Sequence, residues 1–263
     1  MSPKNDGSLW TDSHCHLAMA DFDGDRAGAI ERAKAFGVKR LVSVGTNPGD
    51  WDEAAALANG DDIVATAGLH PHEASKWNGD VAASLASALG RPSVRAVGEI
   101  GLDFHYDISP REVQIEAFAA QLAIAQERGL PPVIHSREAF DKTVDVLRGL
   151  RWSAPGIIHC FTYGEDKVKP FLDLGFTISV SGIVTFPRAE ELRSAVKCVP
   201  IGRLLVETDS PYLAPVPFRG KRCEPAHVAR VGEFLAGCLQ IAPEELALAT
   251  SSNAAKLFAW PAP

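Results

Sequence analysis

The stretch VRAVGEIGLDFHYDISPREVQIEAFAAQLAIAQERGLPPVIHS, residues 94–136, contains one complete strand–helix–strand unit. Its apolar, β-branched runs at 94–100 and 132–136 predict two strands, and the segment between them carries apolar residues three and four apart, as a helix does. Ser109 offers a capping hydroxyl, Pro110 suits a first turn, and Glu112 follows the serine by three residues. We therefore expect a helix to begin at this point.

The same alternation continues along the chain, with Pro225 and Pro243 opening the last two predicted helices. The predicted strands are 9–12, 40–45, 63–69, 94–100, 132–136, 156–160, 176–181 and 204–208. Eight strands, each followed by a helix, predict an α/β fold of the (β/α)8 TIM-barrel type, and an open doubly wound sheet is the alternative. We expect residues 1–8 to be a short polar extension and residues 9–263 to be a single barrel domain, since no linker or repeat interrupts them.

Composition limits the classes of function. The 263 residues include 26 Lys+Arg and 33 Asp+Glu, a formal charge of −7, which excludes a protein that coats DNA through its overall charge. The polar start lacks the apolar core of a signal peptide, and no stretch approaches the ~18 apolar residues of a membrane span. We therefore expect a cytoplasmic protein without a membrane partner, whose five scattered cysteines are reduced thiols.

Metal-binding side chains gather at the ends of the predicted strands. His14 and His16 are two residues apart in an extended segment, so both imidazoles face the same side. Glu99 lies among glycines and apolar residues, where a cation would offset the cost of burying a carboxylate. The fifth, sixth and eighth predicted strands end near His135, His159 and Asp209. Each residue alone could be an ordinary core, cap or turn residue, but together they fall where barrel active sites form.

The number of these donors predicts two divalent ions. Four imidazoles and two carboxylates are more than one tetrahedral zinc ion uses, and Glu99 lies midway between the two histidine groups in strand order, so we expect it to bridge. Mixed nitrogen and oxygen donors suit Zn²⁺, Mn²⁺, Co²⁺ or Mg²⁺. We predict Asp209 and Glu99 as catalytic residues, with Asp209 accepting a proton from water or, as the alternative, serving only as a ligand.

Phosphate contacts are expected beside this site. His70 and, less directly, His72 end the third predicted strand, and Arg137 follows His135. Arg222 belongs to the basic loop 218–222, FRGKR, which is either a phosphate-binding loop or an ordinary solvated turn. Aromatic residues beyond the strand ends either stack on bases or close the barrel mouth. They are Phe104, Tyr106, Phe161 and Phe186.

Nine motifs together resemble one family, the TatD-type metal-dependent deoxyribonucleases and hydrolases, from about residue 9 to residue 258. They are DSHCHL, GLHPH, GEIGLDF, VIHSR, HCFT, SGIVTF, LLVETDSPYLAP, PFRGKRCEP and TSSNAAKLF. The resemblance implies a TIM barrel of the metal-dependent hydrolase type with divalent metals at its top. One metal would be held by His14, His16, Glu99 and Asp209, and the other by Glu99, His135 and His159.

Two positions qualify the resemblance. Cys223 stands where the family often has asparagine, and no lysine occupies the Glu99 position, so a carbamylated-lysine bridge is not expected.

The resemblance also implies cleavage of DNA phosphodiester bonds, as a 3′-5′ exodeoxyribonuclease acting on single-stranded ends, with DNA as substrate and no obligate protein partner. The residues alone leave two alternatives open, because a fold does not fix a function. One is a dinuclear-metal hydrolase of a small-molecule or aminoacyl ester or amide. The other is a metal-stabilised binding protein without turnover.

Overall fold

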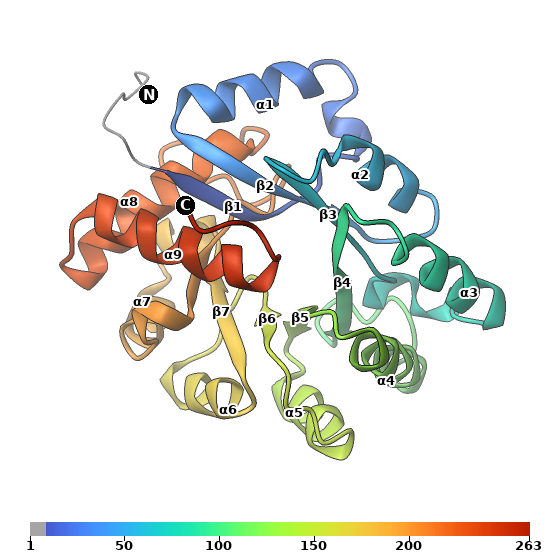
Figure 1. Cartoon of the computed structure of the whole chain (residues 1–263). Helices are drawn as coiled ribbons and strands as arrows, with labels where there is room; N and C mark the ends of the chain where they lie inside the picture. The colour runs from blue at the N-terminus through green and yellow to red at the C-terminus, as the bar shows by residue number, and fades with distance from the viewer. Residues whose placement is uncertain (1–8) are drawn as a thin grey trace.

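Eight parallel strands form the centre of the molecule (Figure 1), for which a computed structural model describes residues 9–263. The strands are β1 (Trp10–Cys15), β2 (Val38–Gly45), β3 (Ile63–Ala67), β4 (Val94–Asp103), β5 (Pro132–Arg137), β6 (Gly156–Ile158), β7 (Phe176–Val180) and β8 (Leu204–Val206). All eight predicted strands are confirmed, with ends that differ by a few residues. The predicted extension over residues 1–8 lies outside the described residues.

The strands follow one another around the sheet in chain order, and each pairs in parallel with the next. The first and last strands also meet, because Cys15 forms a parallel bridge with Ser210 just past β8. Two backbone hydrogen bonds support this closure, from Asp209 N to the His14 carbonyl at 2.9 Å and from His16 N to the Ser210 carbonyl at 2.8 Å. The predicted TIM barrel is therefore confirmed rather than an open sheet, and we propose that residues 9–263 form one domain.

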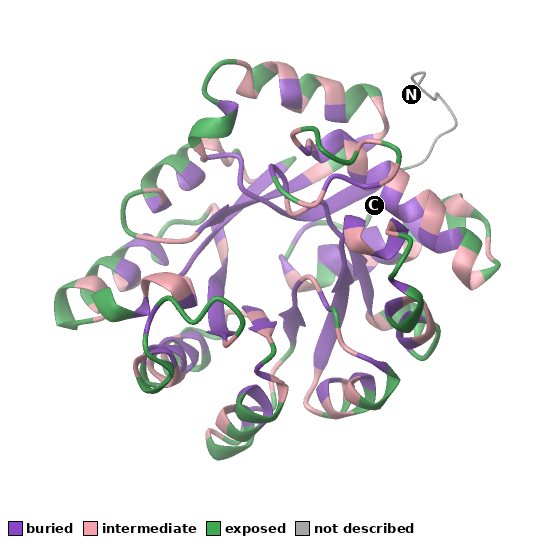
Figure 2. Cartoon of the chain, turned by 180° about the vertical axis from the view of Figure 1, so that it is seen from behind, coloured by how far each residue is buried: buried purple, intermediate pink, exposed green. Residues whose placement is uncertain are grey.

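Helices surround the strands. The α-helices are α1 (Arg26–Ala35), α2 (Trp51–Leu57), α3 (Gly79–Ala88), α4 (Arg111–Arg128), α5 (Phe140–Gly149), α6 (Val168–Asp173), α7 (Glu190–Lys197), α8 (Val228–Leu239) and α9 (Pro243–Leu257). Short 3₁₀ turns are η1 (Ala20–Phe22), η2 (Pro71–Lys76), η3 (Glu165–Lys167), η4 (Gly182–Thr185), η5 (Ile201–Arg203) and η6 (Pro225–His227). Figure 2 shows that the strands are buried and that the helices bury one face and expose the other. Among residues 9–263, no helix is both long and apolar enough to cross a membrane.

The inside of the barrel is closed at the end where the strands begin. Inward-facing apolar residues of the strands, such as Val42, Val64 and Val133, form a buried cluster with Phe258 and Trp260. These two aromatic residues follow α9, which lies across this end of the ring (red in Figure 1). The opposite end, where the strands finish, is left for polar side chains.

The predicted start of α4 is nearly right, but the predicted cap is wrong. The helix begins at Arg111 with Pro110 at its N-cap, and no side chain caps it. Ser109 is instead buried between segments, where its hydroxyl donates to the His72 carbonyl at 2.9 Å and accepts from Ser75 N at 3.1 Å. The hydroxyl thus ties the loop before α4 to η2, a contact that only the fold creates.

The packing of α8 on β1 gives a test of the core. A Cβ at Gly232 would collide with the six-membered ring of Trp10, whereas a Cβ at Gly237 of the same helix would meet nothing. Alanine improves helix propensity at both positions. We expect Gly232→Ala to be less stable than Gly237→Ala by about 1–3 kcal/mol, the usual cost of overpacking a core. Urea unfolding of both variants measures this difference, and equal midpoints would contradict the packing described.

Candidate metal centre

His14 and His16 lie at the carboxyl end of β1, where alternation directs both imidazoles into the barrel mouth. Their Nε2 atoms are 3.3 Å apart, as expected for side chains two residues apart in an extended segment. Cys15, between them, faces the other way and contacts the Val42 carbonyl through its thiol. The predicted convergence of the two imidazoles is confirmed.

Glu99 lies within β4, four residues before its end, instead of at the end as predicted. The pairing of β4 with β5 is irregular between Val97 and Ile100, and this irregularity includes Glu99. Gly101 has φ +140°, and a Cβ there would collide with the His135 carbonyl. Glycine at this position therefore allows β4 to approach β5, and the Glu99 and His135 side chains lie side by side.

The two oxygens of the Glu99 carboxylate face different groups of imidazoles. Oε1 is 2.9 Å from Nδ1 of His135 and 3.0 Å from Nε2 of His159. Oε2 is 3.4 Å from Nε2 of His14 and 3.8 Å from Nε2 of His16. The carboxylate thus stands between the two histidine groups, as strand order had suggested.

Asp209 reaches the same site from the loop after β8. Its Oδ1 is 3.2 Å from Nε2 of His16 and 3.8 Å from Nε2 of His14. The residue has φ +56°, and its backbone N–H donates to the His14 carbonyl. Closure of the barrel between β1 and β8 therefore brings Asp209 beside the His14–His16 pair.

His70 lies inside this cluster, closer than a residue expected only to contact substrate phosphate. Its Nε2 is 3.4 Å from Oε1 of Glu99, and it shares a group of metal-binding side chains with Glu99 and His135. His72 lies at the edge, where its Nε2 is 3.0 Å from Oδ2 of Asp103. The structure therefore offers His70 as a further nitrogen donor.

Two buried carboxylates of the site, Asp103 and Glu207, were missed by the sequence reasoning. Oδ2 of Asp103 is 3.2 Å from Nε2 of His135, and Oε1 of Glu207 is 3.0 Å from Nδ1 of His159. A signal existed for both. Asp103 is four residues after Glu99 in one strand, and Glu207 is two residues before Asp209, so an alternating pattern places each pair on one side.

Both candidate carboxylate ligands and two of the five imidazoles have protonation states that suit a cation. Burial by itself would raise the pKa of Glu99, but the surrounding imidazoles of His159, His70, His135 and His14 hold it well below its usual range. Burial would also raise the pKa of Asp209, but the hydrogen bond with His16 keeps it lowered. Burial lowers the pKa of His14 and brings the pKa of His70 to about 4. Burial alone would lower the pKa of His16, His135 and His159, but the nearby carboxylates raise it, so these three imidazoles would lose a proton when a metal binds.

The donor set itself fits divalent cations. Three overlapping groups have donor atoms within 4.8 Å of one another: His14, Glu99 and His159; His14, His16 and Asp209; and His70, Glu99 and His135. Hydrogen bonds alone do not satisfy this arrangement, since Nδ1 of the fully buried His14 has no partner within the described residues. Five imidazoles and two carboxylates that converge in this way match the nitrogen and oxygen ligands of Zn²⁺, Mn²⁺ and Co²⁺.

Arg137 and Arg222, the predicted phosphate contacts, differ in their surroundings. Arg137 ends β5, two residues after His135, and its guanidinium lies 4.7 Å from the ring centre of Tyr106. Arg222 is paired with Asp25 at 2.7 Å and with Glu224 at 2.9 Å, and hydrogen bonding from Arg222 holds the pKa of Asp25 below its usual range. A phosphate contact by Arg222 would compete with these ion pairs, so Arg137 is the better placed of the two.

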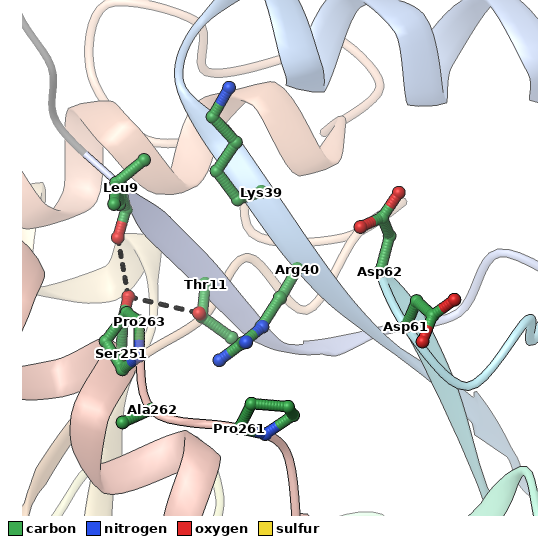
Figure 3. A pocket seen from close by; sticks show the side chains of 10 residues that line it. All are labelled: Leu9, Thr11, Lys39, Arg40, Asp61, Asp62, Ser251, Pro261, Ala262 and Pro263. Atoms are coloured by element: carbon green, nitrogen blue, oxygen red, sulfur yellow. Dashed lines mark hydrogen bonds between the residues drawn. The ribbon is translucent and has the colours of Figure 1, made fainter.

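A cavity of about 360 Å³ lies at the other end of the barrel (Figure 3). Its residues come from the starts of strands and from the C-terminal segment: Leu9, Thr11, Lys39, Arg40, Asp61, Asp62, Ser251, Pro261, Ala262 and Pro263. Ser251 bridges Thr11 and the Leu9 carbonyl there. The charged residues have both signs and include none of the metal-binding groups above, so the cavity is separate from the candidate centre.

Comparison with known proteins gives consistent matches over nearly the whole chain. The sequence model of the family described as TatD related DNase matches residues 11–259. The Bacillus subtilis protein named uncharacterized metal-dependent hydrolase YabD is 39% identical over 249 residues, which cover 94% of this chain and 98% of that protein. The Erwinia billingiae protein named 3'-5' ssDNA/RNA exonuclease TatD is 38% identical over 255 residues, with 94% and 98% covered.

A solved structure agrees with these sequence matches. The crystal structure of YJJV, a TatD homolog from Escherichia coli K12, superposes with a TM-score of 0.90 at 32% identity. The superposition covers 96% of this chain and 98% of that chain. Fold and sequence therefore point to the same group of proteins.

Proposed function

Because this chain belongs to the TatD related DNase family of metal-dependent hydrolases, we propose that it cleaves phosphodiester bonds of DNA, as a 3′-5′ exonuclease on single-stranded ends. The main structural support for this proposal is the position of Glu99. Its two oxygens face separate histidine groups, an arrangement suited to a carboxylate shared by two divalent ions. We propose His14, His16, Glu99 and Asp209 as ligands of one ion, and Glu99, His135 and His159 as ligands of the other, with His70 beside the second.

The chemistry needed is the attack of water on a phosphorus atom. When bound, two divalent cations would lower the pKa of a water molecule and neutralise charge that develops on phosphoryl oxygens. Asp209 uses Oδ1 in its described contacts with His14 and His16. We assign its Oδ2 the role of accepting a proton from the attacking water, a role that requires hydrogen-bond reach.

Although the chain is acidic overall, DNA would bind through positive charge concentrated at the mouth of the barrel. The chain carries −7, and Glu99 and Asp209 contribute two of the negative charges. Two divalent cations would more than offset these two carboxylates and make the mouth locally positive. Arg137 beside the site and the exposed Arg219 and Lys221 add positive charge at the carboxyl ends of the strands. This distribution of charge suits the binding of one phosphodiester at the mouth and does not suit binding along the length of a duplex.

The test compares substrates under metal control. The full chain is loaded with Zn²⁺, Mn²⁺, Co²⁺ or Mg²⁺ and incubated with 5′-labelled single-stranded DNA, a p-nitrophenyl phosphodiester and a panel of esters. We expect stepwise shortening from the 3′ end, its loss with chelator, and its loss when the 3′ end is blocked. Esters cleaved in place of DNA would favour the small-molecule hydrolase, and no turnover with metal bound would favour a binding protein.

Removal of the Arg137 guanidinium should weaken substrate use. A charged hydrogen bond contributes about 1.5–3 kcal/mol, so Arg137→Ala is expected to lower kcat/KM for single-stranded DNA roughly 10- to 100-fold. It should also reduce the salt dependence of DNA binding by about one phosphate contact. Arg148→Ala, on the exposed face of α5, is the matched control. An unchanged salt slope in Arg137→Ala would remove this residue from the substrate contacts.

A further inference from the structure

Two histidines of the candidate centre each contact a second buried carboxylate through the ring nitrogen that does not face Glu99. His135 contacts Glu99 through Nδ1 at 2.9 Å and Asp103 through Nε2 at 3.2 Å. His159 contacts Glu99 through Nε2 at 3.0 Å and Glu207 through Nδ1 at 3.0 Å. The two imidazoles thus present opposite ring nitrogens to the same Glu99 oxygen.

The chemistry of imidazole gives this arrangement a consequence. A neutral imidazole has one N–H donor and one nitrogen with a free lone pair, while an ionised carboxylate only accepts. A carboxylate against one ring nitrogen therefore fixes the proton there and leaves the lone pair on the other. In metal sites such partners set the tautomer and the ring orientation of the ligand.

Glu207 is well anchored for this role. Its side chain is fully buried. Oε1 also accepts the backbone N–H of Cys160 at 2.8 Å, and Oε2 accepts the Ser179 hydroxyl at 2.5 Å. The carboxylate therefore has a fixed orientation, and His159 cannot rotate its ring without losing this partner.

Asp103 is anchored from the other side of the mouth. Oδ1 accepts the backbone N–H groups of His105 at 3.0 Å and Tyr106 at 2.8 Å. Oδ2 faces Nε2 of His72 as well as Nε2 of His135. Both oxygens thus face donors, and the side chain, 1% exposed, is almost out of contact with water.

We infer that Asp103 and Glu207 are positioning residues that fix opposite tautomers, with the proton on Nε2 of His135 and on Nδ1 of His159. The free Nδ1 of His135 and the free Nε2 of His159 then face a divalent cation at Glu99. This inference rests on the proposed function for the presence of that cation. Neither carboxylate touches substrate in this scheme.

The variants follow from the hydrogen bonds. Asp103→Asn places an NH2 group against donors in either orientation, because both oxygens of Asp103 face them. Glu207→Met keeps the volume but removes the acceptor, whereas Glu207→Gln keeps an acceptor for His159 and is the conservative rescue. Asp173→Asn is the control for the loss of a carboxylate, since Asp173 is exposed and pairs with Lys169.

The first readout is zinc binding by the full metal-free chain, measured by competition with a chromophoric chelator. We expect Asp103→Asn and Glu207→Met to bind Zn²⁺ roughly 10- to 100-fold more weakly than the wild type. Glu207→Gln and Asp173→Asn should stay close to the wild type. Denaturant unfolding of each variant shows whether it is folded, so that a folding failure is not read as lost affinity.

The second readout is the tautomer itself. Long-range ¹H–¹⁵N spectra of the zinc-loaded, histidine-labelled chain should show an Nε2–H form for His135 and an Nδ1–H form for His159, assigned with single histidine variants. The same tautomer in both rings would overturn the inference. So would wild-type zinc affinity in folded Asp103→Asn and Glu207→Met. A wild-type chain that binds no zinc would overturn the metal centre and the inference together, whereas the other two results leave the centre intact.

Discussion

Glu99→Gln is expected to lower DNA hydrolysis by a factor on the order of 10⁴, as much as the loss of a general base at most, because it removes the proposed ligand shared by both ions. The reason is geometric. Each oxygen of Glu99 faces a different group of imidazoles. In glutamine one of these oxygens is replaced by an NH2 group, which only donates hydrogen bonds and cannot serve as a metal ligand beside its group of imidazoles. The loss of negative charge further weakens both cation positions at once.

Metal analysis by mass spectrometry, with single-turnover rates, measures the effect. Glu127→Gln makes the same chemical change on the exposed face of α4 and should leave metal content and rate unchanged. We expect the Glu99 variant to hold less metal than the wild type at equal free metal. Full metal content with full turnover would show that Glu99 is not the shared ligand.

Asp209→Asn is expected to lower the rate by about 10²–10⁴-fold, the range for a positioned general base. Asparagine keeps an oxygen that can face His16 but cannot accept a proton as a carboxylate does. Because the hydrogen bond with His16 lowers the pKa of Asp209 against the effect of burial, the base form is present at neutral pH. Acidification should therefore not remove this base until well below neutrality.

Excess metal separates the two roles of Asp209. If the residue serves as a base, the rate of Asp209→Asn should stay low when metal is saturating. If it serves only as a ligand, saturating metal should restore the rate, and the assigned role would be wrong. Asp173→Asn, a solvent-exposed change, is the control for the substitution itself.

The barrel could be predicted because its signals are local. Apolar runs of strand length alternate with stretches of helical period, and burial of a parallel sheet on both faces needs only that pattern. The positions of four candidate ligands could also be predicted, since the carboxyl ends of parallel strands gather at one face. They are His14, His16, His135 and His159. Glu99 was found by its chemistry, although β4 continues beyond it to Asp103.

Residues whose partners lie far away in sequence could not be assigned in the same way. Ser109 has the spacing of a helix cap, but the fold places the His72 carbonyl beside it, and the hydroxyl bonds there. Arg222 belongs to a basic loop, but Asp25, almost two hundred positions earlier, pairs with it. A local pattern carries no information on such partners.

The sequence by itself determined the class of fold and most of the candidate metal-binding side chains, with His70 as the exception, because hydrophobic period and the placement of residues at strand ends are properties of neighbouring residues. The tertiary structure decided which carboxylate contacts which imidazole. Only the register of β4 against β5 brings Asp103 to His135, and only the ring of strands brings Glu207 to His159. Contacts between distant segments arise when the barrel closes and buries them together, so their partners follow from packing and not from any single stretch of chain.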